Sequence, residues 1–117
     1  MTSHYKDKKV TVVGLARSGA AASSLLRSLG AEVFVTDSSD SDKLRGLAKD
    51  LIREDIKVEL GKHTIDFIRD KDLVVVSPGV SDKSQAILWA NELKIPIISE
   101  IELAWQNCLA KVIAVTG

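Results

Sequence analysis

Near its start the chain reads Lys9-Val10-Thr11-Val12-Val13-Gly14-Leu15-Ala16-Arg17-Ser18-Gly19. An apolar run of β-branched residues stops at Gly14 and a helical pattern begins at Ser18, which predicts a buried strand, a tight turn and a helix N-terminus. The first amides of a helix lack intrahelical partners and carry the positive end of the helix dipole, which favours a phosphate or another anion at this turn. We expect Gly14 to adopt dihedral angles that a side chain forbids, and Gly19 to let the helix approach the strand.

The glycine spacing of this turn matches the dinucleotide-binding pattern G-x-G-x-x-G except in the middle, where Ala16 stands in place of a glycine. The replaced glycine is the one that lets a pyrophosphate approach the backbone most closely. The turn therefore has two interpretations, a phosphate-binding site or a strand-to-helix turn without a ligand.

Strand-like and helix-like patterns alternate along the rest of the chain. Short connections between such elements imply right-handed crossovers and a mostly parallel sheet. The predicted fold is therefore α/β, a Rossmann-like three-layer domain with a mostly parallel five-stranded sheet. Strands are predicted at residues 10–13, 32–36, 56–60, 73–76 and 95–99, and helices at residues 18–29, 44–52, 84–93 and 100–107, with a short segment at 65–68 capped by Thr64. The helix at 100–107 is interpreted as a linker, and residues 111–116 as a further buried strand.

A strand order of 3-2-1-4-5 would place the ligand-binding crevice at the carboxyl ends of the first and fourth strands. Residues 14–19, Asp37 and residues 77–79 all follow or end predicted strands and would meet there. An acidic residue at the position of Asp37 binds the ribose hydroxyls of NAD in dinucleotide-binding domains. The same carboxylate could accept the N3–H of a uracil, or it could be a helix N-cap or loop residue. Arg17 could likewise pair with a phosphate or remain solvated.

The composition bounds the class of protein. The 117 residues are 45% hydrophobic, with 16 basic and 16 acidic side chains and a formal net charge of zero. These values fit one globular domain and argue against a nucleic-acid groove or a membrane patch. The lone Cys108 has apolar neighbours and is expected to be a structural thiol. No apolar run approaches the ~20 residues of a membrane span, so we expect a cytoplasmic protein. The zero net charge favours a small-molecule partner, and a monomer is expected.

Other candidate residues receive structural interpretations. His4 and His63 lack metal-ligand spacing and are interpreted as surface residues, so no metal site is predicted. Trp89 and Trp105 have apolar helical neighbours and are interpreted as packing residues. No pattern of a nucleophile with its base is present, so no catalytic residue is predicted in this chain.

Several segments together resemble the N-terminal part of the Mur ligase family. The resemblance covers nearly the whole chain from Lys9 onward and implies the first of three domains, which binds the UDP part of the substrate. A central domain would bind ATP, and a C-terminal domain the incoming amino acid. The segments are Gly14-Leu15-Ala16-Arg17-Ser18-Gly19, Asp37, Asp72-Leu73-Val74-Val75-Val76-Ser77-Pro78-Gly79-Val80, Ile95-Pro96-Ile97-Ile98-Ser99-Glu100-Ile101-Glu102-Leu103-Ala104 and Val112-Ile113-Ala114-Val115-Thr116-Gly117.

This resemblance implies that residues 1–107 bind the UDP moiety of UDP-N-acetylmuramoyl-L-alanine. Residues 108–117 would be a linker and the first strand of the ATP-binding domain, whose ATP loop would start at Gly117. The implied contacts are Arg17 and Ser18 with the diphosphate, Asp37 and the Ser38 backbone N–H with the uracil edge, and Ser77, Pro78 and Gly79 with the uridine and sugar.

The resemblance also implies a whole enzyme that forms an amide in peptidoglycan precursor synthesis. ATP with magnesium would be its cofactors and D-glutamate its second substrate, all bound outside this chain. We therefore expect no cofactor in these 117 residues, and no ligase or ATPase activity from them alone.

One position departs from the family pattern. Relatives carry a uracil-stacking arginine two positions after the aspartate, where this chain has Ser39. Either Arg17 or Lys43 takes over that contact, or the nucleotide is held more weakly. Two other functions stay open: an NAD(P)-binding Rossmann domain of an oxidoreductase or nucleotide sensor, and a binding module without chemistry of its own.

Overall fold

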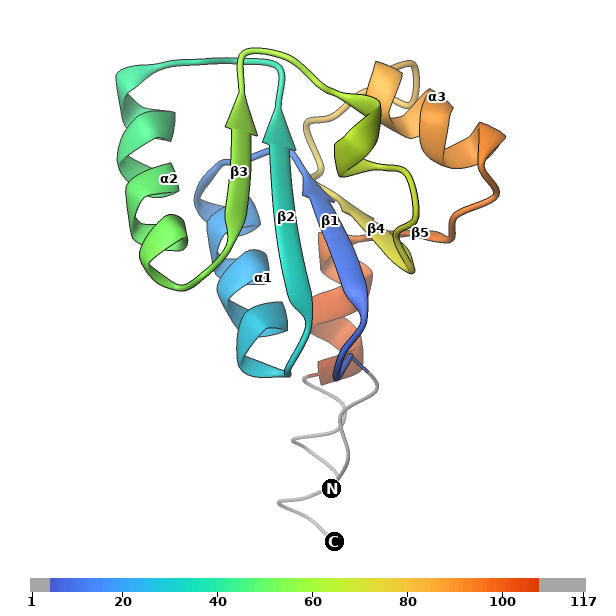
Figure 1. Ribbon diagram of the computed structural model, residues 1–117, viewed down its shortest axis with the longest axis horizontal. Coiled ribbons are helices and arrows are strands. Elements are labelled where there is room, and N and C mark those ends of the chain that lie inside the picture. Colours follow the sequence, from blue (N-terminus) through green and yellow to red (C-terminus); the bar gives the residue numbers. More distant parts are fainter. Residues whose placement is uncertain (1–4, 108–117) are drawn as a thin grey trace, which may run out of the picture.

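The computed structural model describes residues 5–107 and contains one sheet of five parallel strands in the order β3-β2-β1-β4-β5 (Figure 1). This order confirms the prediction and puts β1 at the centre. Residues 10–13 of β1 are fully buried because the strand lies between two neighbours and two helical layers. The strands are β1 (Lys9–Val13), β2 (Glu32–Asp37), β3 (Lys57–Leu60), β4 (Leu73–Val76) and β5 (Ile97–Ser99).

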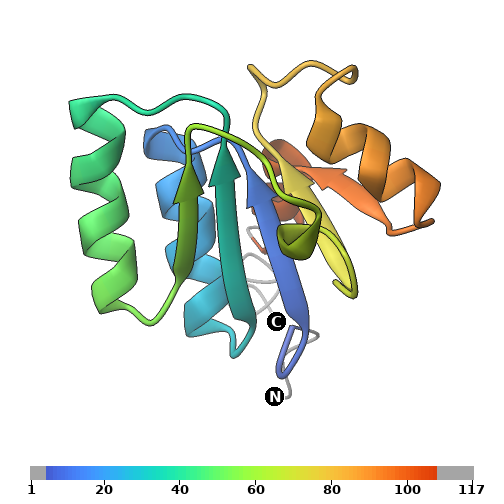
Figure 2. The same cartoon turned by 45° about the horizontal axis from the view of Figure 1, so that its top comes forward.

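Helices cover both faces of the sheet, as Figures 1 and 2 show. On one face lie α1 (Arg17–Ser28), α2 (Asp42–Arg53) and the helical residues 100–107, and their core cluster contains Val10 and Val12. On the other face lie α3 (Gln85–Glu92) and the short 3-10 helix η1 (Ile65–Phe67), where the cluster contains Val13. Successive strand residues point to opposite faces, so one apolar run supplies both cores and the three-layer prediction is confirmed.

The ends of the helices follow their local sequences. Gly30, just after α1, has φ +93°, a left-handed conformation that ends the helix. The polar loop before α2 supplies an N-cap, because Ser41 Oγ accepts a hydrogen bond from the Leu44 N–H at 3.2 Å. Thr64 is the N-cap residue of η1, at the predicted position, but its hydroxyl donates to Glu59 Oε1 at 2.7 Å and makes no cap bond to the helix.

The helix at residues 100–107 belongs to the core, so its interpretation as a linker is wrong. Leu103 is only 1% exposed and packs in the same cluster as α1 and α2. Trp105 is 67% exposed, so its interpretation as a packing residue is wrong. Trp105 follows Leu103 by two residues and so lies about 200° away around the helix axis, on the opposite side from the core. Trp89 does pack against the cluster beneath α3. The predicted strand at 111–116, Cys108 and Gly117 lie outside the described residues.

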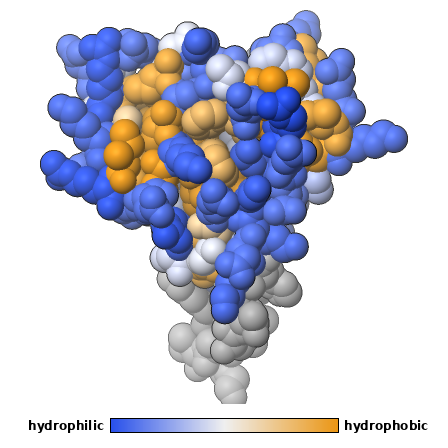
Figure 3. Space-filling view, viewed as in Figure 1, coloured by the Kyte–Doolittle hydropathy of each residue, from blue (hydrophilic) through white to orange (hydrophobic). Residues whose placement is uncertain are grey.

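On the sheet face that carries η1, the short helix and a lysine side chain cover Phe34 of β2. Phe34 on β2 packs edge-on against Phe67 with 5.8 Å between ring centroids, and the Lys71 ammonium lies 4.2 Å from the Phe34 ring centroid. Burial, reinforced by the nearby charge of Lys9, lowers the pKa of Lys71. Seen from the same side as in Figure 1, the surface has hydrophobic side chains in its middle part and hydrophilic ones around them (Figure 3).

None of the helices within residues 5–107 has the length and apolar character that crossing a membrane requires.

Candidate functional site

A cavity of about 740 Å³ opens at the carboxyl ends of the central strands. The three loops expected to meet there all contribute to it: the turn after β1, the end of β2 and the turn after β4. Of the predicted site residues, Gly14, Ser18, Asp37, Ser38, Ser77, Pro78 and Gly79 line this cavity. The remaining lining residues are Val13, Leu15, Ala16, Ser39, His63, Val80, Ser81, Ser84 and Gln85.

Two glycines let the turn after β1 pack tightly, and both have the steric roles expected of them. Gly14 has φ +99°, and a Cβ there would lie 2.8 Å from Ser77 Cβ. A Cβ on Gly19 would lie 2.2 Å from the Gly14 carbonyl oxygen, closer than any real side chain is found. The first turn of α1 therefore touches the strand-to-helix turn directly, which brings the helix N-terminus to the cavity.

The N-terminus of α1 is open to an anion. Its N-cap, Ala16, offers no side-chain hydrogen bond, and its first turn contains no acidic residue. Ala16 and Ser18 both line the cavity. Uncapped amides and the positive end of the helix dipole favour negative charge at this position.

Asp37 joins two of the loops. Its Oδ2 accepts a hydrogen bond from the Leu15 N–H at 2.7 Å, and its Oδ1 accepts one from the Ser39 N–H at 2.8 Å. The carboxylate therefore fixes the turn after β1 against the end of β2. Each carboxylate oxygen can accept a further hydrogen bond, so this structural role leaves acceptor capacity beside the cavity. The N-cap of α2 is Ser41, which excludes that role for Asp37.

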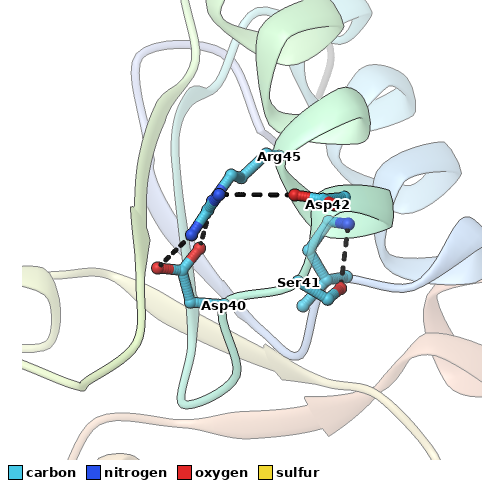
Figure 4. Close-up of polar contacts among 5 residues, drawn as sticks. Asp40, Ser41, Asp42 and Arg45 are labelled. Carbon is cyan, nitrogen blue, oxygen red and sulfur yellow. Dashed lines mark hydrogen bonds and ion pairs between the residues drawn. The ribbon is translucent and has the colours of Figure 1, made fainter.

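The loop that carries Ser38 and Ser39 is fastened on both sides. Arg45 grips the Asp40 carboxylate with two hydrogen bonds, from Nε at 2.7 Å and from Nη2 at 3.1 Å, and a third bond reaches Asp42 (Figure 4). Hydrogen bonding to Arg45 lowers the pKa of Asp40 and raises that of the arginine. The Gly61 N–H donates to the carbonyls of Asp37 and Ser39 at 2.9 and 3.1 Å. This wall of the cavity is thus held in place before any ligand arrives.

The turn after β4 is anchored from beneath. The Ser77 hydroxyl lies 2.8 Å from the Gly14 carbonyl oxygen and also contacts Glu100 Oε1. Glu100 is buried, and its other carboxylate oxygen has no hydrogen-bond partner among the described residues. The contact with Ser77 ties the helix at residues 100–107 to the cavity floor, a link that sequence reasoning missed.

The structure does not bring the expected cations into the cavity. Arg17 and Lys43 are exposed, and neither is a lining residue. Gly19 also lies outside the lining, beneath the turn. Within residues 5–107 the lining of this cavity therefore contains no arginine or lysine side chain.

His63 is the main residue that the sequence interpretation misplaced. It was expected at the surface, but it is half-buried and lines the cavity. Its Nδ1 lies 2.7 Å from the hydroxyl oxygen of Thr36, and its Nε2 lies 3.4 Å from that of Ser84. A usable signal was present, because His63 lies in the turn after the strand predicted beside β2, at the same edge of the sheet.

The comparisons with known proteins bear on this geometry. The family model of the Mur ligase MurD-like N-terminal domain matches residues 8–99. This chain belongs to the MurD-like Mur ligases. The match includes all three loops of the cavity, so the open α1 N-terminus and Asp37 are parts of a MurD-like domain.

Curated relatives of this MurD-like chain carry one common name. It is 43% identical over 112 residues to the UDP-N-acetylmuramoylalanine–D-glutamate ligase of Koribacter versatilis, with 96% of the chain and 25% of the relative covered. The enzyme of the same name from Geotalea uraniireducens is 44% identical over 111 residues, with 95% and 24% covered. The chain thus spans about a quarter of the length of these relatives.

Solved structures agree on the fold. The UDP-N-acetylmuramate-alanine ligase of Thermotoga maritima superposes with a TM-score of 0.70 at 23% identity, covering 89% of this chain and 23% of the other. The shikimate dehydrogenase of Aquifex aeolicus reaches 0.52 at 15% identity, covering 82% and 43%. At these identities both likenesses describe the Rossmann-like fold alone.

Proposed function

We propose that the cavity binds the UDP part of UDP-N-acetylmuramoyl-L-alanine. The observation that carries this proposal is the meeting, in one cavity of about 740 Å³, of an uncapped helix N-terminus and an aspartate that retains acceptor capacity. The first suits a diphosphate and the second suits the N–H of a uracil. Membership in the MurD-like family supports the same ligand.

The individual contacts follow from this placement. The first-turn amides of α1 and the Ser18 hydroxyl would bind the diphosphate, and Arg17 could join them only by reaching in from the exposed side. Asp37 would accept the uracil N3–H, with the Ser38 N–H beside it. The turn at residues 77–79 would form the wall against the uridine and sugar.

The activity of a whole enzyme is proposed from the relatives. We propose that this chain serves an ATP-dependent ligase that joins D-glutamate to UDP-N-acetylmuramoyl-L-alanine, because the curated relatives carry that enzyme's name. The ATP and magnesium sites, the domain boundary after residue 107 and the start of the ATP loop at Gly117 remain predictions, as do a monomeric state and a cytoplasmic location.

Calorimetric titration of the 117-residue chain with UDP and with NADH tests the site. We expect UDP to bind and NADH to give no heat. Asp37→Asn should weaken UDP binding by roughly ten- to a hundredfold, the range of a hydrogen bond to a charged group. Asp50→Asn is the matched control, because Asp50 is exposed on α2 and away from the cavity lining. Binding of NADH without UDP would instead support a dinucleotide domain, and an unchanged affinity of Asp37→Asn would remove Asp37 from the site.

A further inference from the structure

A chain of polar side chains leads from β3 to the cavity. Thr36 Oγ1 lies 2.7 Å from Glu59 Oε2 and 2.7 Å from His63 Nδ1. Glu59 also accepts hydrogen bonds from the N–H and the hydroxyl of Thr64, at 2.9 and 2.7 Å. Thr36 is fully buried, whereas His63 reaches the cavity lining. The arrangement connects a carboxylate outside the cavity with an imidazole at its wall.

The number of hydrogens available to Thr36 and Glu59 determines which ring nitrogen of His63 carries a hydrogen. A threonine hydroxyl has one hydrogen, and an ionised carboxylate only accepts, so Thr36 must donate to Glu59. Thr36 then has only lone pairs left for His63, whose Nδ1 must carry the hydrogen. In the neutral ring Nε2 is therefore an acceptor.

The Nε2 atom lies beside Ser84, a second residue of the cavity lining. Its one neighbour in hydrogen-bond range among the described residues is the Ser84 hydroxyl, at a long 3.4 Å. Ser84 is the N-cap of α3 but makes no side-chain cap bond, and it also lines the cavity. This weak contact leaves the Nε2 lone pair ready for a ligand hydrogen.

The UDP part of the proposed ligand has few groups that can donate a hydrogen bond to Nε2. A diphosphate has none at neutral pH, and the single N–H of uracil is assigned above to Asp37. The remaining donors near the base are the ribose hydroxyls. We propose that His63 is a ligand-contacting residue whose Nε2 accepts a hydrogen bond from a ribose hydroxyl, with Thr36 and Glu59 as positioning residues that hold the Nδ1–H form. This inference rests on the proposed binding of UDP.

The imidazole form can be measured without a ligand. Two-bond proton–nitrogen NMR spectra of the 117-residue chain should show His63 with its hydrogen on Nδ1. Thr36→Val keeps the shape of the buried side chain and removes the hydroxyl, so His63 should lose this preference. A wild-type spectrum with the hydrogen on Nε2 would overturn the positioning role.

Two substitutions of His63 distinguish the roles of its Nδ1 and Nε2 atoms. In His63→Asn the amide N–H can still reach Thr36, but nothing replaces Nε2, so UDP binding should weaken roughly fivefold, the effect of one neutral hydrogen bond. In His63→Gln the longer side chain places a carboxamide oxygen near the Nε2 position, so most of the affinity should remain. Equal affinities of wild type and His63→Asn would overturn the ligand contact.

Deoxy ligands identify the hydroxyl. For 2′-deoxy-UDP or 3′-deoxy-UDP, whichever lacks the contacting group, wild type and His63→Asn should bind equally, because the interaction is already absent. A loss of the same size with UDP and with both deoxy ligands would mean that His63 only shapes the wall, and would overturn the proposal. If wild type binds no UDP at all, the proposed function fails and the ligand contact with it, whereas the NMR result still reports on Thr36.

Discussion

Gly14 and Gly19 determine how closely the backbone segments around the cavity approach one another. A Cβ at Gly19 would lie 2.2 Å from the Gly14 carbonyl oxygen, and this neighbour is backbone that cannot rotate away. The packing of α1 on the turn therefore depends on the absence of a side chain at Gly19. The shape of the cavity therefore depends on the absence of a Cβ atom at these two glycines.

Gly19→Ala should destabilise the fold by about 1–3 kcal/mol, the usual cost of forcing an extra methyl group into a packed contact. The matched control is Gly46→Ala, because Gly46 lies within α2 and a Cβ there would have no neighbour within 4 Å. This control should gain roughly 0.5–1 kcal/mol from its lower backbone entropy in the unfolded state. Urea denaturation followed by circular dichroism measures both, and wild-type stability of Gly19→Ala would contradict the steric argument.

Asp40 and Arg45 predict a pH dependence. Their hydrogen bond lowers the pKa of Asp40 in the folded state. Because the pKa of Asp40 is lower in the folded state, its ionised form stabilises the folded protein. This contribution to the free energy of unfolding is complete above the pKa of Asp40 in the unfolded state and is lost as the pH falls through its pKa in the folded state. Asp40→Asn should therefore lose less stability on acidification than wild type, by a small margin because the pair is exposed.

Urea midpoints measured over a range of acidic pH values test this expectation. Arg45→Gln should show the same shallower slope as Asp40→Asn, because either substitution removes the pair. A steeper acid limb in either variant would have the wrong sign.

Among the elements, the helix at residues 100–107 differs most from its prediction. Its sequence is interpreted as a linker. In the structure Leu103 completes the core beneath α1, and Glu100 contacts Ser77 on the cavity floor. The helix at residues 100–107 therefore supports a turn 23 residues earlier in the sequence.

Leu103→Ala should cost about 2–5 kcal/mol because it leaves a cavity in a packed core. Ile101→Ala on the same helix should change stability by less than about 0.5 kcal/mol, because Ile101 is 70% exposed. Thermal and urea unfolding compare the two variants. Similar stabilities would show that the helix is a linker after all.

At the scale of the whole molecule, the strand order and the position of the cavity were predictable. Buried β-branched runs, short helical connections and the right-handed crossover rule leave few arrangements for such a chain. Residues that end or directly follow β1, β2 and β4 must then gather at one edge, as Gly14, Asp37 and Ser77 do. His63 could have been placed by the same reasoning, whereas its bond to Thr36 could not.

Periodicity and glycine placement in the sequence alone were sufficient for the elements, their order, the buried central strand and the edge that holds the cavity, because these depend on local preferences and general packing rules. Tertiary structure alone determined the long-range contacts that the side chains around that cavity make. Arg17 lies outside the cavity lining, Asp37 accepts a hydrogen bond from the Leu15 N–H, and Thr36 contacts Glu59 and His63. Hydrogen bonds between residues more than 20 positions apart depend on strand register and side-chain direction, which no local pattern encodes.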